Sequence, residues 1–243
     1  MKKWIIAAAL ASLAVTAQAA ETIRFAASAT YPPFESLDKE NNLVGFDIDL
    51  AKALCQEMKA ECTFTNNAFD SLIPSLKFRR YDAVISGMDI TTERSKQVDF
   101  TQPYYANSAI VIAPKGRFSS FGDLKEKRIG VENGTTHQKY LQDKHPEVKV
   151  VAYDSYQNAI LDMKSGRLDG VFGDSAVVNQ WLKANPDLAT VGEHVTDADY
   201  FGTGLGIAVR KGNTALRDRF NQALTELKAN GSWQQLNQKW FPE

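Results

Sequence analysis

The sequence holds few residues suited to a metal site. Among its 243 residues there are only two cysteines, Cys55 and Cys62, and three histidines. His137, His145 and His194 show no metal-ligand spacing, and none of them joins the two thiols in a cluster. Because structural zinc takes four ligands in characteristic spacings, we expect no metal ion in this protein.

Sequence motifs of common enzymes and cofactor sites are also missing. The chain has no Gly-x-Ser-x-Gly nucleophile elbow and no Walker phosphate-binding loop. Its glycine-rich stretch, Gly202–Gly206, lacks the spacing of a dinucleotide loop and runs into a strand pattern at Ile207–Val209. We interpret this stretch as a flexible crossing or a close backbone approach. We therefore expect neither a cofactor nor enzymatic activity.

Neither sign of charge is in excess. The 28 lysines and arginines nearly balance the 29 aspartates and glutamates, which leaves a formal net charge of −1. The basic residues are spread along the chain, whereas a nucleic-acid binder carries them in patches or stripes. We expect a monomer that binds no nucleic acid.

A long apolar run occurs at the start of the chain. It covers Trp4–Val15, follows Lys2 and Lys3, and precedes the small-residue triplet Ala17–Ala19. This order is typical of a signal peptide that is cleaved after the triplet. The alternative is a membrane anchor, but the run is shorter than the roughly 20 residues that span a bilayer. We predict export to the periplasm.

Export would expose both cysteines to an oxidising compartment, which favours a disulfide between Cys55 and Cys62. Residues 20–243 contain no second long apolar stretch, so we expect the mature protein to be soluble. Their length suits one large domain or two modest ones with an ample core.

Extended and helical patterns alternate along the chain, which predicts an α/β protein with largely parallel sheets. The expected strands are Thr22–Ala27, Cys62–Thr65, Ala83–Ser86, Ile129–Val131, Val148–Ala152 and Gly170–Phe172. The expected helices are one that is N-capped by Asp47 and reaches Met58, then Ser71–Lys77, Thr136–Lys144, Ser155–Lys164 and Ala176–Lys183. The last forty residues look helical, with a break near Asn230-Gly231.

One internal similarity links the two halves of the chain. Residues 76–87 and 163–174 are identical at four of twelve positions, and both run from a helix end through a basic turn and an aspartate into a buried strand. They could be two ordinary helix-to-strand connections. If the halves are related, Ser86–Asp89 and Gly173–Asp174 would face each other across a cleft, because ligands of open α/β sheets bind beyond the carboxyl ends of strands.

Charged side chains follow these two strands. Arg94 lies in the first turn of a short helix after Gly87–Asp89, where backbone N–H groups favour an anion and the guanidinium can grip a carboxylate. The alternative is an arginine on a solvated helix face. Asp174 could accept a ligand ammonium, or serve as the N-cap of the next helix.

Two aromatic residues and a polar loop complete the candidate site. Tyr31 lies in a rigid proline-containing loop and Phe69 precedes a helix start, so that a planar guanidinium could lie between the two rings. Core packing is the alternative for either ring. The loop 133–136 offers hydroxyls and N–H groups before a helix, or is an ordinary N-cap loop.

With these residues in view, the chain resembles the polar amino-acid family of periplasmic binding proteins that serve ABC importers, and within it the arginine-binding members. The resemblance covers essentially the whole mature chain. No single matching segment identifies the family by itself, but the order and spacing of the segments together are specific for it. These segments are Tyr31–Glu35, Gly45–Ala51, Leu72–Leu76, Phe100–Tyr104, Asn133–Thr136 and Phe201–Gly204.

The resemblance implies a type II fold in which two α/β lobes, each with a mainly parallel sheet, are joined by two hinge strands. After the signal peptide of residues 1–19, the first lobe would take residues 20–107 and 203–243, and the second 108–202. Tyr105–Ser108 and Phe201–Gly204 would be the hinges. The resemblance also supports the disulfide.

The resemblance further implies a role for each candidate residue. Arg94 would clamp an α-carboxylate, helped by the backbone at Asp89 and Thr136. Asp174 would accept the α-ammonium, with Ser86 or Gly87 assisting. Tyr31 and Phe69 would flank the ligand side chain, and the remaining neighbours at the site would be Met88 and Thr135.

One position departs from the family pattern. Many family members that take basic ligands have a carboxylate where this chain has Ser28. Glu132, just before the 133–136 loop, could supply that charge from the other lobe, and Glu35 and Asp89 are further candidates. His137 replaces a common glutamine and would line the edge of the site.

Together these features predict a periplasmic protein that captures L-arginine, or a related basic amino acid, by lobe closure and delivers it to an inner-membrane ABC permease. The sequence does not separate arginine from lysine, ornithine or histidine. A dehydratase-like enzyme on the same fold is the alternative from another class. A sensor ectodomain is a third, but we expect no transmembrane helix to follow the domain.

Overall fold

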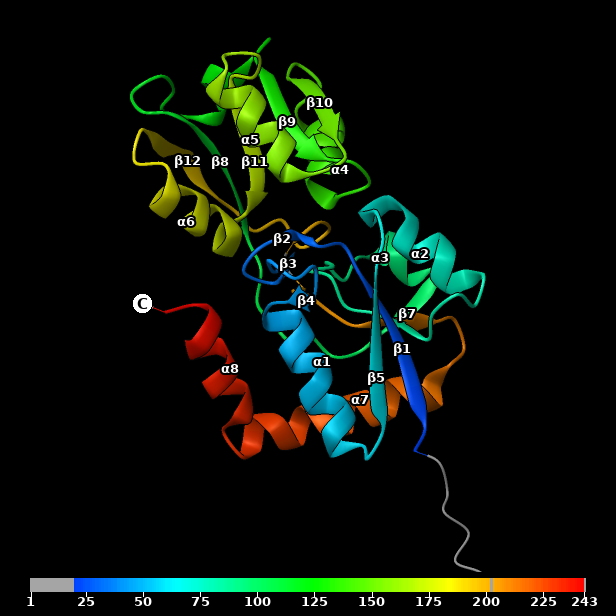
Figure 1. The fold of residues 1–243 in the computed structure, drawn as a ribbon. Helices are drawn as coiled ribbons and strands as arrows, with labels where there is room; N and C mark the ends of the chain where they lie inside the picture. The colour runs from blue at the N-terminus through cyan, green and yellow to red at the C-terminus, as the bar shows by residue number, and fades with distance from the viewer. Residues whose placement is uncertain (1–19, 202, 243) are drawn as a thin grey trace, which may run out of the picture.

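Two five-stranded sheets, one in each lobe, organise the chain (Figure 1). The computed structural model describes residues 20–201 and 203–242, so the predicted signal peptide lies outside the described residues. Within the described part of the chain, no helix is long and apolar enough to cross a membrane. The two-lobed α/β fold predicted from the sequence is confirmed.

The two sheets have the same design. Reading across the first, the strands are β5 (Glu61–Asn66), β1 (Thr22–Ala27), β6 (Ala83–Val84), β13 (Ala208–Arg210) and β7 (Val98–Phe100). Across the second they are β10 (Lys149–Tyr153), β9 (Arg128–Glu132), β11 (Gly170–Asp174), β8 (Ala109–Pro114) and β12 (Leu188–Val195). In each sheet four strands run one way, and the fourth strand of the order, β13 or β8, runs against both its neighbours.

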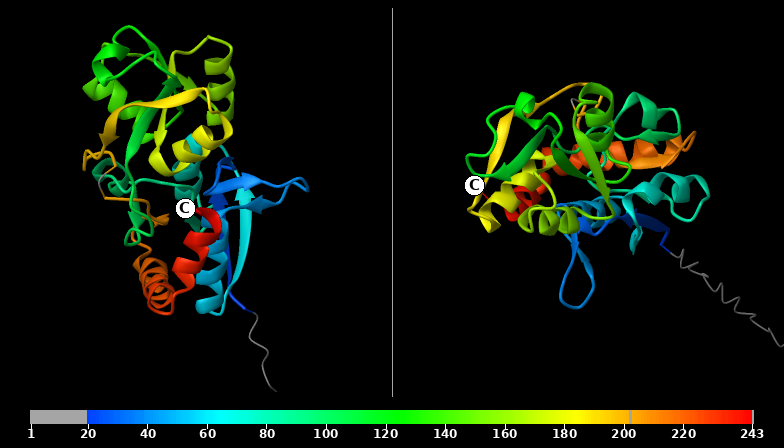
Figure 2. Two further views of the ribbon diagram at one scale, coloured as in Figure 1. Left: turned by 90° about the vertical axis from the view of Figure 1, so that its left-hand side faces the viewer. Right: turned by 90° about the horizontal axis from the view of Figure 1, so that it is seen from above.

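Helices flank each sheet. The first lobe carries α1 (Phe46–Glu57), α2 (Phe69–Lys77), α3 (Thr92–Ser95), α7 (Thr214–Ala229) and α8 (Ser232–Trp240). The second carries the short η1 (Phe121–Leu124), α4 (Thr136–Lys144), α5 (Tyr156–Lys164) and α6 (Ser175–Ala184). A small sheet of β2 (Thr30–Tyr31), β3 (Glu35–Leu37) and β4 (Leu43–Val44) belongs to the first lobe, and its β3–β4 turn projects outward (Figure 2). The predicted break between the last helices falls at Gly231, as expected.

The start of α1 corrects one prediction. Asp47 was expected to cap this helix, but the N-cap is Gly45, and no side chain caps it. Gly45 has a φ of +140°, and a Cβ there would lie 2.1 Å from the carbonyl oxygen of Phe34. Only glycine fits this close approach, so the helix starts earlier than predicted. The Asp47 carboxylate points instead into the interior.

The internal similarity extends to hydrogen bonds. In the first lobe Asp82 accepts from the backbone N–H and the Nε of Arg24, whose Nη2 reaches the carbonyl of Arg79. The second lobe repeats this arrangement, donor for donor, with Asp169, Arg128 and Gly166. Arg79 and Gly166 also share a left-handed backbone, with φ of +62° and +77°. The two segments therefore occupy equivalent places in the two lobes.

The chain crosses between the lobes twice, once between β7 and β8 and once between β12 and β13 (Figure 1). The crossings meet at Leu205, which forms antiparallel bridges with Asp89 and with Tyr105. The Tyr105 ring packs 5.1 Å from that of Phe34 and 4.9 Å from that of Phe241. Both crossings are thus anchored on the first lobe.

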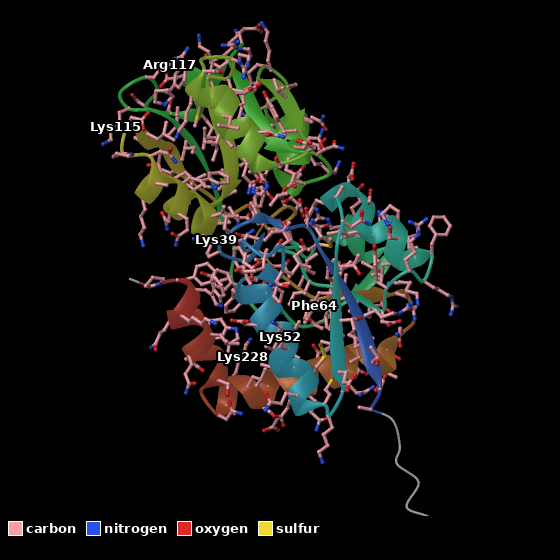
Figure 3. All side chains as sticks on the ribbon, in the orientation of Figure 1. Lys39, Lys52, Phe64, Lys115, Arg117 and Lys228 are labelled. Atoms are coloured by element: carbon pink, nitrogen blue, oxygen red, sulfur yellow. A yellow bond between two sulfur atoms is a disulfide. The ribbon has the colours of Figure 1, made fainter. Side chains whose placement is uncertain are left out.

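The predicted disulfide is confirmed: Cys55, near the end of α1, is bonded to Cys62 in β5. Figure 3 shows the side chains over both lobes. The cations labelled there lie apart, with Lys115 and Arg117 on the second lobe and Lys52 and Lys228 on the first. This spread agrees with the dispersed charge of the sequence.

Candidate ligand-binding site between the lobes

The carboxyl ends of parallel strands from both lobes meet at one cavity. Ser28 follows β1, Gly87 follows β6, Glu132 ends β9 and Asp174 ends β11. The space between its lining atoms is about 280 Å³, part of it open to solvent, and only about 10 Å³ admits the centre of a water-sized sphere, which is room for about one water molecule. Its lining residues are Ser28, Tyr31, Glu35, Phe69, Gly87, Asp89, Glu132, Thr135, Thr136, His137, Tyr156 and Asp174.

Three predicted site residues do not line this cavity. Ser86 lies beneath it, fully buried, and its Oγ donates to Glu35 Oε1 at 2.7 Å. Met88 packs in the hydrophobic cluster that includes Leu72 of α2. Arg94 lies beyond the cavity wall, in a larger groove that opens between the lobes and shares Thr135 and Thr136 with the cavity.

Arg94 is held by both lobes. Its guanidinium donates from Nη1 to the carbonyl of Asp89 at 3.0 Å and from Nη2 to that of Gly134 at 3.2 Å. The guanidinium also lies over the Phe69 ring, 5.4 Å from its centroid. The residue is only 9% exposed, and burial lowers its pKa while nearby Asp89 opposes that shift. The solvated helix face considered as an alternative is therefore wrong.

Asp174 turns its carboxylate into the cavity. The residue occupies the N-cap position of α6, but its side chain makes no cap hydrogen bond. Instead Oδ2 accepts from the hydroxyl of Tyr31 at 2.7 Å, and Oδ1 accepts from Asn107 Nδ2 at 2.7 Å. His137 Nε2 lies 3.0 Å from Oδ1 without hydrogen-bond geometry. The carboxylate is thus held by groups of both lobes and of a crossing.

Asp89 is the matching carboxylate of the first lobe. Its Oδ2 accepts from the hydroxyl of Thr136 in the second lobe at 2.6 Å, and its Oδ1 accepts from Asn107 Nδ2 at 2.7 Å. Burial raises the pKa of Asp89 to about 7, and the negative charge of Asp174 contributes to this shift. The charge of Asp174 therefore favours the protonated form of Asp89.

Glu132 reaches across the cavity from the second lobe. Its Oε1 accepts from the hydroxyl of Thr30 at 2.9 Å, and that hydroxyl lies 3.4 Å from Ser28 Oγ. Burial raises the pKa of Glu132 to about 8, and the carboxylates of Asp154 and Asp70 add to the effect. Glu132 thus brings a carboxyl group close to Ser28.

A buried pair of acids supports the floor of the cavity. Asp47 Oδ2 accepts from the backbone N–H of Gly87 at 2.8 Å and from the hydroxyl of Tyr104 at 2.8 Å. Burial raises the pKa of Asp47 to about 7, and burial, together with the charge of Asp47, raises the pKa of Glu35 well above its usual range. A raised pKa favours the neutral form of each acid, which lets the two acids lie side by side.

Aromatic side chains form the apolar part of the cavity. Tyr31 stacks on Tyr156 with ring centroids 5.2 Å apart and planes inclined by 27°. The hydroxyl of Tyr156 lies 3.1 Å from Nδ1 of His137, which is itself buried. Phe69 enters the wall from the start of α2. Tyr31 and Phe69 both reach the cavity, but the rings stacked on Tyr31 are those of Tyr156 and Phe34.

Sequence reasoning missed Tyr156, Thr30 and Asn107. Tyr156 directly follows the N-cap of α5, where the sequence looks like an ordinary helix start. Thr30 precedes Tyr31 in a loop where only the ring suggested a ligand contact. Asn107 falls in the predicted hinge, and a polar residue on a crossing near two strand-end acids was the signal that could have drawn attention to it.

Acidic side chains outnumber basic ones in the lining of the cavity. Four carboxyl groups line it, and over the described residues no lysine or arginine does. No group of three or more histidine, cysteine or acidic side chains in residues 20–201 and 203–242 is arranged to hold a metal ion. Such a cavity suits a small molecule that carries more positive than negative charge and has a flat or apolar portion for the rings.

Known proteins similar to this chain are binding proteins. It is 68% identical over 243 residues to the ABC transporter arginine-binding protein 1 of Escherichia coli K12, with 100% of each chain covered. It is 47% identical over 241 residues to the arginine-binding periplasmic protein of Mannheimia haemolytica, with 99% of each covered. Neither of these relatives is named as an enzyme, in agreement with the prediction.

A solved structure extends the likeness to three dimensions. It is described as the structural basis for high arginine specificity in a Salmonella typhimurium periplasmic binding protein. It shares 56% identity and a TM-score of 0.88 with this chain, and the match covers 91% of this chain and 100% of that one. The model of the bacterial extracellular solute-binding proteins, family 3, matches residues 23–243, and the chain belongs to this family.

Proposed function

We propose that this protein captures L-arginine between its lobes in the periplasm and delivers it to an ABC transporter of the inner membrane. The observation that carries the proposal is the interlobe cavity, with four carboxyl groups, two predicted ring partners and no lining cation among the described residues. Arginine has two cationic groups and one anionic group, so its net charge complements that cavity. The arginine-binding relatives support the same ligand.

The ligand's α-carboxylate and α-ammonium are assigned to different residues of the site. The α-carboxylate would lie where the cavity adjoins the groove of Arg94, near the backbone of Asp89 and the start of α4 at Thr136. The α-ammonium would lie on Asp174, close to Gly87. Arg94 is buried and charged, which makes an anionic partner favourable there.

The ligand side chain is assigned to the other end of the cavity. The guanidinium would pair with Glu132 and lie between the rings of Tyr31 and Phe69. Glu35, whose pKa burial raises well above its usual range, would be a hydrogen-bond partner near it rather than a charge partner. A cation beside Glu132 would lower the pKa of that carboxyl and ionise it.

Capture would follow from contacts with both lobes. A ligand that touches Arg94 in one lobe and Asp174 in the other binds the closed state better than the open one, so it shifts the hinge equilibrium toward closure. We take residues 20–107 and 203–243 as one moving body and 108–202 as the other, with hinges at 105–108 and 201–204. Residues 1–19 would direct export, and the mature protein would act as a monomer.

The direct test is ligand screening on the mature chain. Thermal-shift assays with the twenty amino acids and ornithine should give the largest increase in melting temperature with L-arginine, because a tight ligand stabilises the folded state by mass action. Calorimetry would then give the dissociation constant. A larger increase with an acidic or apolar amino acid, or no increase with any of them, would contradict the proposal.

A further inference from the structure

Asn107 is a side chain of the first crossing that contacts a carboxylate of each lobe. Its Nδ2 donates to Asp89 Oδ1 and to Asp174 Oδ1, both at 2.7 Å. Its own Oδ1 accepts from the backbone N–H of Ser108 at 2.8 Å. This third hydrogen bond fixes the orientation of the amide, because the reversed amide would set its carbonyl oxygen against two acids.

The amide is one of few donors that face this pair of acids. Asp89 otherwise accepts from Thr136, and Asp174 otherwise accepts from Tyr31. Each acid is at most 2% exposed, so water does little to stabilise its charge. The titratable groups close enough to act on one or both are Arg94, His137, Tyr31, Tyr156 and Glu132.

We propose that Asn107 is a positioning residue that holds the carboxyls of Asp89 and Asp174 side by side and favours the ionised form of Asp89, ready for the zwitterionic end of the ligand. The inference rests on the proposed function, in which Asp174 takes the α-ammonium and the Asp89 backbone takes the α-carboxylate. Two like charges in a dry site repel each other and favour protonation. A shared amide that donates to both offsets this repulsion without adding a charge that would compete with the ligand.

Two substitutions separate this role from simple packing. Asn107→Ala removes both donors, and arginine affinity at pH 8 should fall by at least about ten-fold, since hydrogen bonds to charged groups are the strong ones. Asn107→Asp keeps the shape but adds a third acid, and its affinity at pH 8 should be lower still. A steric role predicts the opposite order, so an aspartate variant that binds better than the alanine variant overturns the proposal.

The control is Lys183→Ala. The Lys183 ammonium also crosses between the lobes, donating to the backbone carbonyl of Pro242 at 3.3 Å, but it touches neither Asp89 nor Asp174. Its loss should change the affinity by no more than about two-fold. A loss as large as that of Asn107→Ala would show that any interlobe hydrogen bond matters equally, which would contradict the specific role.

The pH profile provides a second readout, which also decides the case if the aspartate variant fails to fold. Calorimetry from pH 6 to pH 9 should show that the acid-side decline of arginine affinity lies at higher pH in Asn107→Ala than in the wild type. A loss of the same factor at every pH would overturn the inference. If the wild type does not bind arginine, the proposed function fails instead, so the two failures are distinguishable.

Discussion

Among single residues, Glu132 decides how strongly the site should prefer a guanidinium. Glu132→Gln keeps the shape and removes the charge, so we expect L-arginine to bind roughly 10 to 100 times more weakly, the range for a charged hydrogen bond. L-citrulline is nearly isosteric with arginine but uncharged in its side chain, and its affinity should change little. Calorimetry with both ligands measures the ratio.

Glu93 supplies the control for this substitution. Its side chain is 61% exposed at the mouth of the groove, where it pairs with Lys139. Exposed pairs contribute little, so Glu93→Gln should leave arginine affinity within about two-fold. Equal losses of arginine and citrulline in Glu132→Gln would exclude Glu132 as the guanidinium partner.

Arg94 should decide recognition of the opposite end of the ligand. Arg94→Ala should weaken L-arginine by at least about 100-fold, because an anion buried without its partner is strongly unfavourable. Agmatine, which lacks the α-carboxylate, should bind the wild type and the variant with similar weak affinity. The exposed Arg80 is the matched control, and Arg80→Ala should bind arginine normally. Retention of near-native arginine affinity in Arg94→Ala would remove this role.

At the scale of elements, the repeated helix-to-strand turn predicts a stability difference. Gly166 has a φ of +77°, and a Cβ at this position would meet no atom within 4 Å. Gly166→Ala should therefore cost about 1 kcal/mol through its left-handed backbone alone. Arg79 holds the equivalent backbone with a φ of +62°. Arg79→Gly should be neutral or stabilise by up to about 1 kcal/mol.

Urea unfolding would measure both changes in free energy. Gly122 is the control, because its φ is not positive and a Cβ there would meet only Ser120 Oγ at 3.5 Å, an ordinary contact. Gly122→Ala should shift the free energy of unfolding by less than about 0.5 kcal/mol. If Arg79→Gly destabilises the protein more than Gly166→Ala does, the backbone argument is wrong.

Local patterns in the sequence predicted most elements, because a buried strand or an amphipathic helix leaves its period in the residues. The bounds of β1 and α4 were predicted without error. The apolar segment that forms β8 was not predicted as a strand, although it is the antiparallel member of the second sheet. The N-cap of α1 was wrong because a distant carbonyl, that of Phe34, selects glycine there.

The candidate site was partly predictable for a related reason. Carboxyl ends of parallel strands converge, so the acids at strand ends could be expected to meet. Sequence reasoning missed the importance of Asn107, because its partners Asp89 and Asp174 lie 18 and 67 residues away along the chain and meet only in the folded protein. The position of Arg94 outside the cavity likewise involves a contact that the sequence does not show, its hydrogen bond to the carbonyl of Gly134 in the other lobe.

At the scale of the whole molecule, the burial of several acids in and beneath the interlobe cavity lowers the free energy of unfolding. Burial raises the pKa of Glu132 to about 8 and those of Asp89 and Asp47 to about 7, whereas unfolded glutamate and aspartate titrate near 4.5 and 3.8. A bound guanidinium and ammonium would offset the charge of such acids. Ligand binding and proton binding should therefore be linked.

The sign of that link gives a prediction for the free protein. Between about pH 5 and pH 8 the folded state retains protons that the unfolded state has lost, so the free energy of unfolding should decrease as pH rises. Each retained proton contributes up to about 1.4 kcal/mol per pH unit. Urea unfolding at pH 5, 6.5 and 8 should show this decline, and saturating L-arginine should reduce it because the ligand's cations favour the ionised acids.

Glu132→Gln should flatten the decline in the free energy of unfolding of the free protein above about pH 7, because the pKa of Glu132 lies near 8. A free protein that becomes more stable from pH 5 to pH 8 would show that these acids are already ionised without the ligand.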